Sequence, residues 1–390
     1  MRVIVAGGGV AGTASAIALR RIGAEVTVYE AYADPAGTVG SFVSLAANGL
    51  RGLAALGCLD RVRDAGFEVP RQRLWSSTGR RLGDMPRGRL GGDPTHSVTL
   101  MRARLVEELR AEAVRAGARV VTGERLVDAH EDADGEKVRA VFESGRTDEA
   151  DLLVGADGLW SAARTILDPG APRPAYAGQY TFSGLASGVR HDPGTFDMVF
   201  ARAGAFITIG APDGTVWWAA QVSAPREPDL AAIGLDRLAE LYRHEERPST
   251  VLAEVTELHR PTLQHVLQPV RVWRGDRIVL AGDAVHPVGA GQGAAMAVED
   301  AVVLAHALAA APVPAALARY EEERRARTAK LIKMAAANRD AKTAGPVARR
   351  ARDVFMPLGT RLFYERATAW LYTHPLPELP RAGTLSAGGA

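Results

Sequence analysis

Residues 1–30 read MRVIVAGGGVAGTASAIALRRIGAEVTVYE. A β-branched run at residues 3–5 leads into a glycine turn, and apolar residues then recur at helical spacing as far as Ile22. Gly23 stands where a helix C-cap is expected, and residues 24–29 form a second apolar run. The stretch therefore predicts a strand, a helix and a parallel strand, which make one βαβ unit of an α/β sheet.

The glycines of this turn predict a dinucleotide site. Gly7, Gly9 and Gly12 fit the pattern G-x-G-x-x-G, in which the first allows the tight turn, the second admits a pyrophosphate and the third permits close helix–strand packing. The helix N-terminus offers free N–H groups to the phosphates. Glu30, at the tip of the second strand, can accept hydrogen bonds from both hydroxyls of an adenosine ribose. A glycine-rich turn in an ordinary α/β unit is the alternative, and the motif alone does not choose between FAD and NAD.

Composition narrows the class of protein. The 390 residues are enough for two packed regions or one large composite domain. A formal net charge of +2 gives no electrostatic case for nucleic acid or an anionic membrane as a partner. Cys58 is the single cysteine, which excludes an intramolecular disulfide framework and a cysteine-rich metal site. We expect no transmembrane segment, and we predict a cytoplasmic protein that is a monomer or a homodimer.

The pattern of apolar and turn residues divides the rest of the chain. The predicted regions are the first part of the nucleotide-binding domain at residues 1–171, an antiparallel sheet at residues 172–273, the second part of that domain with C-terminal helices at residues 274–381, and a disordered tail at residues 382–390. The predicted local elements are helices at residues 48–66 and 102–118, a loop-rich passage at residues 70–96, hairpins that turn at residues 132–136 and at Asp213-Gly214, a strand at residues 278–281, and a solvated helix face at residues 319–330.

Two further segments have the strand–glycine–helix pattern. They read GADGLWSAAR at residues 155–164 and GDAVHPVGAGQGAAMAVEDA at residues 282–301, and Arg102 of MRARL opens a predicted helix. With the first glycine motif, they make the sequence resemble the FAD-dependent group A aromatic hydroxylases, the para-hydroxybenzoate hydroxylase superfamily. The resemblance implies an α/β protein with a Rossmann-like FAD-binding domain of the GR2 type, an inserted antiparallel-sheet substrate domain and C-terminal helices.

Asp157 and Asp283 each follow an apolar strand, so their carboxylates are expected at the crevice where strands end. Each could instead cap a helix. The resemblance assigns Asp157 to the pyrophosphate region and the nicotinamide cofactor, and Asp283 to a ribityl hydroxyl of FAD. The helix after residue 293 would direct its N-terminal amides toward the flavin. The cofactor-binding residues implied in this way are Gly7, Gly9, Val10, Ala11, Gly12, Glu30, Arg102, Asp157, Gly158, Arg164, Gly282, Asp283, Gly291, Gln292, Gly293 and Ala294.

The resemblance also implies a reaction. NADH or NADPH, as a transient reductant, would reduce FAD, O2 would add to form the flavin C4a-hydroperoxide, and one oxygen atom would hydroxylate or epoxidise an aromatic or otherwise electron-rich small molecule. Such an enzyme is a single-component monooxygenase. The alternatives are a flavin-dependent reductase of isoprenoid double bonds, a flavin halogenase, whose W-x-W-x-I-P signature is absent from this sequence, and a non-catalytic flavin-binding protein.

The substrate pocket is less well defined by the sequence. The loop HPVGAGQG is two residues shorter than the HPxxPxxGQG loop of many relatives, so the resemblance does not extend to the substrate. Strand alternation directs Trp217 and Trp218 to opposite faces, so at most one of them should line a pocket. No residue is identified as a general base. The pocket candidates are Phe182, Phe206, Trp217, Trp218, His286 and Pro287, with an ordinary core position as the alternative for the aromatic residues.

Overall fold

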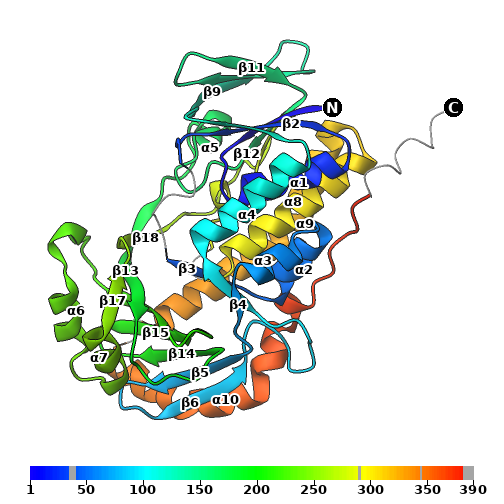
Figure 1. Ribbon diagram of the computed structural model, residues 1–390. Helices are drawn as coiled ribbons and strands as arrows, with labels where there is room; N and C mark the ends of the chain where they lie inside the picture. The colour runs from blue at the N-terminus through cyan, green and yellow to red at the C-terminus, as the bar shows by residue number, and fades with distance from the viewer. Residues whose placement is uncertain (35–40, 289–290, 343–344, 381–390) are drawn as a thin grey trace.

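A computed structural model describes residues 1–34, 41–288, 291–342 and 345–380. The chain builds an upper α/β part and a lower part centred on a large sheet, and the C-terminal helix α10 (Pro346–Tyr372) packs on the lower part along strand β6 (Arg81–Pro86) (Figure 1). The predicted disordered tail at residues 382–390 lies outside the described residues.

The upper part contains the predicted parallel sheet. Its strand order is β19-β12-β1-β2-β8, and every neighbouring pair is parallel. The central strand is buried on both faces because a parallel sheet is covered on both sides. The strands of this sheet are β1 (Arg2–Ala6), β2 (Glu25–Glu30), β8 (Arg119–Thr122), β12 (Leu152–Gly155) and β19 (Ile278–Leu280).

Helices and a small sheet cover the two faces of the parallel sheet (Figure 1). Helix α1 contacts both α4 and α8, and α9 packs on α8. On the opposite side, the ring centroids of Tyr29 and Phe142 lie 4.1 Å apart, which joins β2 to the antiparallel sheet β11-β10-β9. The elements concerned are α1 (Val10–Arg21), α4 (Arg102–Arg115), α5 (Ala162–Leu167), α8 (Gly293–Ala310), α9 (Val313–Lys342), β9 (Leu126–Glu131), β10 (Val138–Phe142) and β11 (Thr147–Ala150). The βαβ unit predicted at residues 1–30 and the hairpin at residues 132–136 are confirmed.

The lower part is an eight-stranded, mostly antiparallel sheet. Its order is β17-β13-β16-β15-β14-β5-β6, and β18 also pairs with β13. Its strands are β5 (Arg71–Ser76), β6 (Arg81–Pro86), β13 (Ala175–Ala186), β14 (Thr195–Phe200), β15 (Gly204–Gly210), β16 (Val216–Ser223), β17 (Val255–Leu258) and β18 (Thr262–Val266). The hairpin at Asp213-Gly214 joins β15 to β16, as predicted.

The loop-rich passage predicted at residues 70–96 is wrong in its first half. Strands β5 and β6 form a hairpin there, and β5 extends the eight-stranded sheet by pairing in parallel with β14. Arg71 donates to Asp84 across the hairpin at 2.8 Å, while Leu74 and Leu82 are buried. The charged residues that pair on the solvent side gave these strands the polar composition of a loop, so the strands were not predicted.

Two helix predictions also need correction. The single helix expected at residues 48–66 is two helices, which are separated at Gly57, whose φ of +69° ends the first one. The inserted sheet carries two helices that were not predicted. The helices concerned are α2 (Ala47–Ala55), α3 (Leu59–Asp64), α6 (Leu235–Tyr242) and α7 (Glu246–Ala253).

The remaining elements are one long helix, two short 3-10 turns and a small sheet. They are α10 (Pro346–Tyr372), the turns Leu230–Ala232 and Gly282–Ala284, and the sheet of β3 (Phe42–Leu45), β7 (Val98–Met101) and β4 (Phe67–Glu68).

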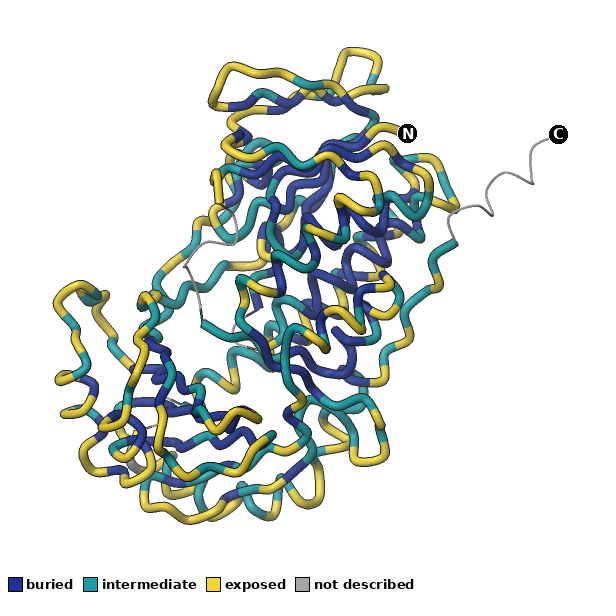
Figure 2. The backbone as a smooth tube through the Cα atoms, in the orientation of Figure 1, coloured by how far each residue is buried: buried dark blue, intermediate teal, exposed yellow. Residues whose placement is uncertain are grey.

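Buried residues concentrate in the upper α/β part and in the lower sheet, with exposed residues outside them (Figure 2). Within the part of the chain that the structure describes, α8 is the one helix that is long and apolar enough to cross a membrane, and 72% of it is buried inside the fold. Its apolar character is explained by its contacts with α1, α2 and α9.

Candidate cofactor site

The turn from β1 to α1 is shaped by its glycines. Gly7 has a φ of +106°, and a Cβ on it would lie 2.3 Å from the carbonyl oxygen of Ala156. A Cβ on Gly12 would lie 1.8 Å from the carbonyl oxygen of Gly7, so α1 sits directly on the turn. A Cβ on Gly9 would meet no described heavy atom within 4 Å. Gly7 and Gly12 therefore allow the turn to pack closely against the loop after β12 and against α1, whereas Gly9 leaves room above the turn.

The start of α1 presents backbone donors to this room. The first helical hydrogen bond runs from the Thr13 N–H to the Gly9 carbonyl at 3.0 Å, so the N–H groups of residues 10–12 have no partner within the helix. No side chain caps α1, and its first turn contains no acidic residue. An anionic group above Gly9 would be favoured by these donors and by the helix dipole.

Glu30 closes the turn from the neighbouring strand. Its Oε2 accepts from the Gly8 N–H at 2.6 Å and its Oε1 accepts from the Tyr32 N–H at 2.9 Å. Although the residue is buried, a carboxylate has about four acceptor positions, so two hydroxyl groups can still donate to it. Glu30 is thus fixed by backbone donors at the edge of the room above Gly9.

Asp157 and Arg164 organise the end of β12. The Ala163 N–H donates to Asp157 Oδ2 at 3.0 Å, while Asp157 Oδ1 is buried without a partner among the described residues. Burial raises the pKa of Asp157, and its bonds to Ser161 and to backbone amides oppose that effect. The capping alternative therefore accounts for one oxygen of the carboxylate, while the other has no partner among the described residues.

Arg164 connects two loops. Its guanidinium donates to the carbonyl oxygens of Leu159 and Ala284, each at 2.8 Å, and burial lowers its pKa. Only 3% of the residue is exposed, so in this arrangement it holds the loop after β12 against the loop after β19. Ser161, which the sequence analysis does not single out, is the N-cap of α5, and its side chain accepts from the Arg164 N–H at 2.8 Å.

The loop after β19 brings Asp283 to the same place. Gly282 has a φ of +61°, and a Cβ on it would lie 2.7 Å from Cβ of Ala11, so this loop lies against the start of α1. No described residue donates a hydrogen bond to the Asp283 carboxylate, which stays accessible to solvent although protein surrounds it. Burial raises its pKa, and the positive charges of His286 and Arg102 oppose that rise. Arg102 is the exposed first residue of α4.

The N-terminus of α8 completes the arrangement. Gly291 has a φ of +110°, and the first helical hydrogen bond runs from the Met296 N–H to the Gln292 carbonyl at 2.9 Å. The N–H groups of residues 293–295 precede that bond, so they have no partner within the helix. Asn48 donates to Gln292 at 3.3 Å, which joins this end of α8 to α2. Gly289 of the shortened loop lies outside the described residues.

A buried ionic network holds α8 from behind. Asp300 accepts from the Gly282 N–H at 2.8 Å and contacts His286 Nε2 and Arg324 Nε, each at 2.7 Å. Glu299 binds Arg324 at 2.7 Å and Arg327 at 2.6 Å. Burial raises the pKa of Asp300, but the charges of His286 and Arg324 outweigh it and lower the pKa to about 2.

This network corrects two predictions. Residues 319–330 are not simply a solvated helix face, because Arg324 and Arg327 are buried against the acids of α8. His286 does not line a pocket, since its side chain is 1% exposed and is held by Asp300, while Pro287 beside it is partly buried. The sequence did contain a signal for this network. Glu299 and Asp300 lie within an otherwise apolar helix, and acids that are buried in this way need cationic partners.

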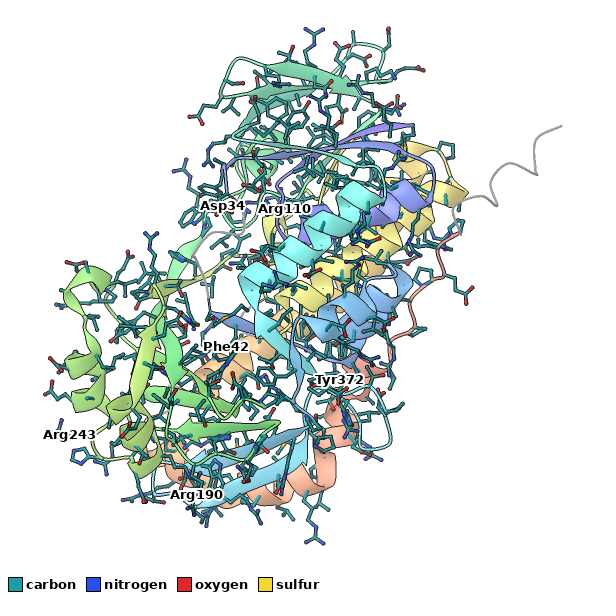
Figure 3. All side chains as sticks on the ribbon, in the orientation of Figure 1. Asp34, Phe42, Arg110, Arg190, Arg243 and Tyr372 are labelled. Carbon is teal, nitrogen blue, oxygen red and sulfur yellow. The ribbon has the colours of Figure 1, made fainter. Side chains whose placement is uncertain are left out.

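The aromatic pocket candidates separate by face of the sheet. Phe182, Phe206 and Trp218 are fully buried in the core under α6 and α7, where the rings of Phe206 and Trp218 stack with 2° between their planes. They are core residues rather than a pocket wall. Trp217 points to the other face, and its ring centroid lies 5.9 Å from that of Phe42. Figure 3 shows Phe42 at the boundary between the two parts of the molecule.

The three glycine turns therefore converge. Gly7 touches Ala156, Gly282 touches Ala11, and Arg164 binds the carbonyl of Ala284, so the ends of β1, β12 and β19 form one rim. The rim offers the N-terminal amides of α1 and α8, the Glu30 carboxylate as an acceptor for ribose hydroxyls, and the Asp283 carboxylate, which has no partner in the described part of the chain. These groups fit the pyrophosphate, ribose and ribityl hydroxyls of FAD, whereas NAD has no ribityl chain for Asp283.

Comparison with known proteins agrees with this geometry. A family model described as an FAD binding domain matches residues 1–335. The chain is 32% identical over 340 residues to the aurachin C monooxygenase/isomerase of Stigmatella aurantiaca, which covers 83% of this chain and 85% of that protein. It is 28% identical over 368 residues to the chloroplastic zeaxanthin epoxidase of an Oncidium hybrid cultivar, covering 86% of this chain but 54% of that longer protein. The crystal structure of Klebsiella pneumoniae HpxO with FAD and uric acid shares the fold, with a TM-score of 0.81 and 24% identity over 95% of this chain and 97% of that one.

Proposed function

Because the chain belongs to the FAD-binding-domain family of group A flavoprotein monooxygenases, with FAD as the cofactor, we propose that it uses NADH or NADPH and O2 to hydroxylate or epoxidise a small molecule. The proposed substrate is aromatic or otherwise electron-rich. The observation that carries the proposal is the Asp283 carboxylate, which has no hydrogen-bond partner among the described residues and lies on a rim with the N-termini of α1 and α8.

Each part of the rim has a role in holding the cofactor. The N–H groups at the start of α1 would bind the pyrophosphate, Glu30 the adenosine ribose and Asp283 the ribityl chain. The N-terminus of α8 would stabilise negative charge on the reduced ring system. When bound, FAD takes reducing equivalents from the nicotinamide and activates O2 for transfer of one oxygen atom to the substrate.

The protein must also keep water from the reacting atoms. Two features support this role for the boundary between the two parts. Trp217 contacts the rings of Phe42 and Phe67, at centroid distances of 5.9 and 5.1 Å, and this aromatic cluster belongs to the face of the sheet away from α6 and α7. Val288, which follows Pro287, is buried in a second apolar cluster with Ala46 and Met296.

The test is to purify the protein, quantify bound FAD and measure NAD(P)H oxidation together with O2 consumption against a panel of phenols, indoles and polyenes. We expect a compound that accelerates both rates and gains one oxygen atom by mass spectrometry. NAD(P)H oxidation that needs a polyene but not O2 would instead identify a reductase. Bound FAD without any oxygen-dependent turnover would overturn the proposal in favour of a non-catalytic flavin-binding protein.

A further inference from the structure

Helix α10 exposes a group of large apolar side chains. Six of the twelve large apolar residues that are exposed in the described part of the chain lie on this helix, which runs along the lower edge of the molecule beside β6 (Figure 1). Single exposed apolar residues are normal at a protein surface, whereas a group of them on one element needs an explanation. The six are Val347, Val354, Phe355, Leu358, Leu362 and Phe363, with exposed fractions between 54% and 83%.

Most of these residues form one stripe along α10. Five of them, together with an exposed alanine, recur at the spacing of an apolar helix face. With about 100° of rotation per residue, they span an arc of about 100° on the surface of the helix, and Phe363 lies outside that arc. We call this set the outer stripe; it consists of Val347, Ala351, Val354, Phe355, Leu358 and Leu362.

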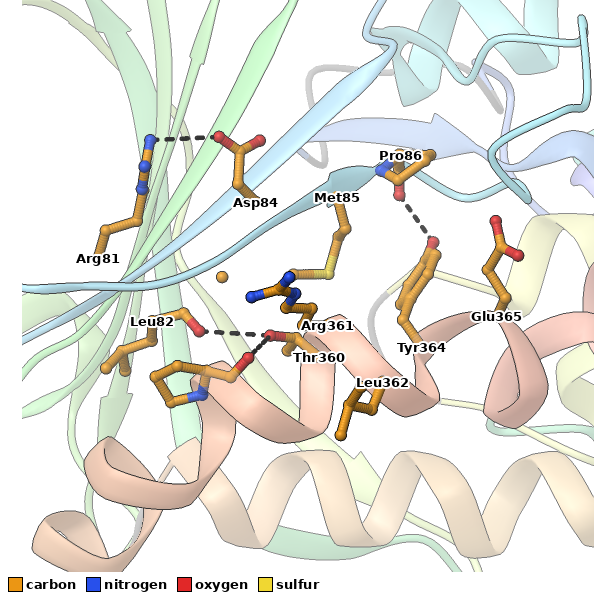
Figure 4. Close-up of a pocket in the computed structure, with 12 residues that line it drawn as sticks. Arg81, Leu82, Asp84, Met85, Pro86, Thr360, Arg361, Leu362, Tyr364 and Glu365 are labelled. Atoms are coloured by element: carbon orange, nitrogen blue, oxygen red, sulfur yellow. Dashed lines mark hydrogen bonds and ion pairs between the residues drawn. The ribbon is translucent and has the colours of Figure 1, made fainter.

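The opposite side of α10 attaches the helix to the sheet. Tyr364 donates to the carbonyl of Pro86 at 2.7 Å, and Thr360 donates to the carbonyl of Leu82 at 3.4 Å. Figure 4 shows Thr360 and Tyr364 directed at β6, whereas Leu362 points to the other side of the helix. The outer stripe therefore does not hold α10 in place, and its exposure is not explained by the fold of this chain.

Positive charge borders the outer stripe. Arg350 and Arg361 follow one side of its arc, and Arg366 follows the other. All three arginines are exposed, and none forms an ion pair with a carboxylate in the described ranges. A pocket of about 510 Å³ between β6 and α10 adjoins the stripe, because Arg361 and Leu362 both line it (Figure 4).

The acids near the stripe are already engaged within the protein. Asp353 contacts Arg352 at 2.8 Å, and Glu365 accepts from a backbone N–H at 2.9 Å. Asp84, on the adjoining strand β6, accepts from Arg71 at 2.8 Å. Helix α10 contains five arginines and two acids, so its net charge of +3 exceeds the +2 of the whole chain. The whole-chain charge, which gave no electrostatic case for an anionic membrane, therefore conceals a basic surface.

Other parts of the same sequence are poorly suited to cover the stripe. In the segments of the sequence outside the described residues, the large apolar residues are Val39 and Leu385. A second copy of the chain would bring the same stripe and the same arginines, since a two-fold interface pairs a surface with itself. Like charges would then meet around the apolar contact, which disfavours the pairing.

An anionic lipid surface matches both features of α10. A helix that lies in a membrane interface places Phe and Leu side chains at the boundary of the acyl chains and places Lys or Arg side chains among the headgroups. Negatively charged headgroups attract basic residues that lie within a Debye length of them. The partner that fits an outward apolar stripe between unpaired arginines is thus a bilayer that contains anionic lipids.

We propose that α10 docks the protein on an anionic membrane, with Phe355, Leu358 and Leu362 among the lipids and the arginines beside the stripe on the headgroup phosphates. The helix would lie on the membrane rather than cross it, because its other side is bound to β6. The proposal goes beyond the proposed function and does not depend on it, since it involves none of the residues assigned to the cofactor.

Sedimentation with lipid vesicles tests the proposal on the full, FAD-loaded chain. One set of vesicles is phosphatidylcholine alone, and the other is equal parts phosphatidylcholine and phosphatidylglycerol. We expect at least about ten-fold stronger binding to the anionic vesicles, since each arginine near such a surface contributes roughly five-fold in affinity. Raising the salt from about 0.1 M to about 1 M should weaken that binding, because the Debye length falls from about 10 Å to about 3 Å.

Two double variants separate the apolar and the charged contributions. Phe355→Gln with Leu358→Gln should lose at least about ten-fold in binding to the anionic vesicles, because both apolar side chains that enter the interface are removed. Arg361→Gln with Arg366→Gln should lose roughly 25-fold, at about five-fold for each charge. Bound FAD and the melting temperature report whether each variant is folded.

Matched controls change the same residue types elsewhere on the surface. Val114→Gln with Val127→Gln alters exposed apolar residues of α4 and β9. Arg173→Gln with Arg226→Gln alters two exposed arginines outside the helices. Both control proteins should bind the anionic vesicles like the unmodified chain.

The proposal is overturned if the unmodified protein does not bind the anionic vesicles, or binds both kinds equally at both salt concentrations. Unchanged binding in both α10 variants overturns it as well. A large fall in the melting temperature of Phe355→Gln with Leu358→Gln would show that the stripe is packed within the protein and would also refute it. If vesicles are not bound and ultracentrifugation shows a dimer that this variant dissociates, the stripe is instead an interface between two copies of the chain.

Discussion

Replacement of Asp283 by alanine is the sharpest test of how the rim holds its cofactor. No described residue donates to this carboxylate, so the substitution removes no hydrogen bond within the protein. Burial raises the pKa of Asp283 above its ordinary value of 3.8, so the folded protein disfavours the ionised carboxylate. The residue therefore lowers the free energy of unfolding once the pH has risen above that value. At neutral pH the FAD-free variant should therefore melt at the same temperature as the parent or slightly higher.

The affinity of Asp283→Ala for FAD, by contrast, should fall. A hydrogen bond from a ribityl hydroxyl to a carboxylate is worth about 1.5–3 kcal/mol, so Asp283→Ala should weaken FAD binding by roughly 10- to 150-fold. The assay is fluorescence titration of FAD into the FAD-free protein, with melting curves recorded in parallel. Asp283→Asn, which retains the shape and one acceptor oxygen, is the control and should lose less affinity. A large loss of melting temperature with FAD affinity intact would show that Asp283 is a structural cap.

Three further substitutions probe the other parts of the site. Glu30→Ala should weaken FAD binding by about 1.5–3 kcal/mol, and unchanged affinity in the same titration would refute the ribose assignment. Gly9→Val should still fold, because a Cβ there meets no described atom within 4 Å, but it should bind no flavin, because the side chain would fill the space above the turn. Full flavin occupancy in its absorption spectrum would show that the glycine serves only the turn. Asp300→Ala leaves Arg324 buried without one of its partners, so urea denaturation should give a loss of about 3–5 kcal/mol, and a loss well below 1 kcal/mol would contradict the stabilising role of the network.

The glycine turns were predictable from the sequence because their signal is local. Each needs a short apolar strand, a residue that tolerates a close approach or a positive φ, and a helix that follows at once. The structure bears this out at Gly7 and Gly282, where Cβ atoms would lie 2.3 and 2.7 Å from other turns of the rim. The position of Asp283 just after a strand followed from the same pattern, whereas the order of the strands in the sheet was not predicted.

The charged segments could not be predicted in the same way, because sequence does not show where a charge finds its partner. Arg71 and Asp84 pair across a hairpin and made two strands look like a loop. Arg324 and Arg327 are buried against acids more than twenty residues away on α8, so their helix looked solvated. In both cases the deciding contact is tertiary.

The aromatic residues show a further limit. Alternation correctly separated Trp217 from Trp218, but it does not say which face of a sheet is covered by helices. Helices α6 and α7 cover the face of Trp218, and neither was predicted from a polar sequence with short apolar runs. The face of Trp217 is left for the boundary with the cofactor-binding part, which is why Phe42 and Phe67 meet it there.

Helix α9 connects the cofactor rim to the eight-stranded sheet. Arg324 and Arg327 fix it against α8, whose N-terminus carries Gln292 and the free amides of the rim. Lys342 lies fifteen residues beyond Arg327 on the same helix, or about 22 Å along its axis. A continuous helix transmits position over that distance because its backbone hydrogen bonds leave little freedom between the two ends. The buried network therefore holds α9 against α8, and through the continuous helix it also influences where Lys342 donates to Gln221 on the sheet.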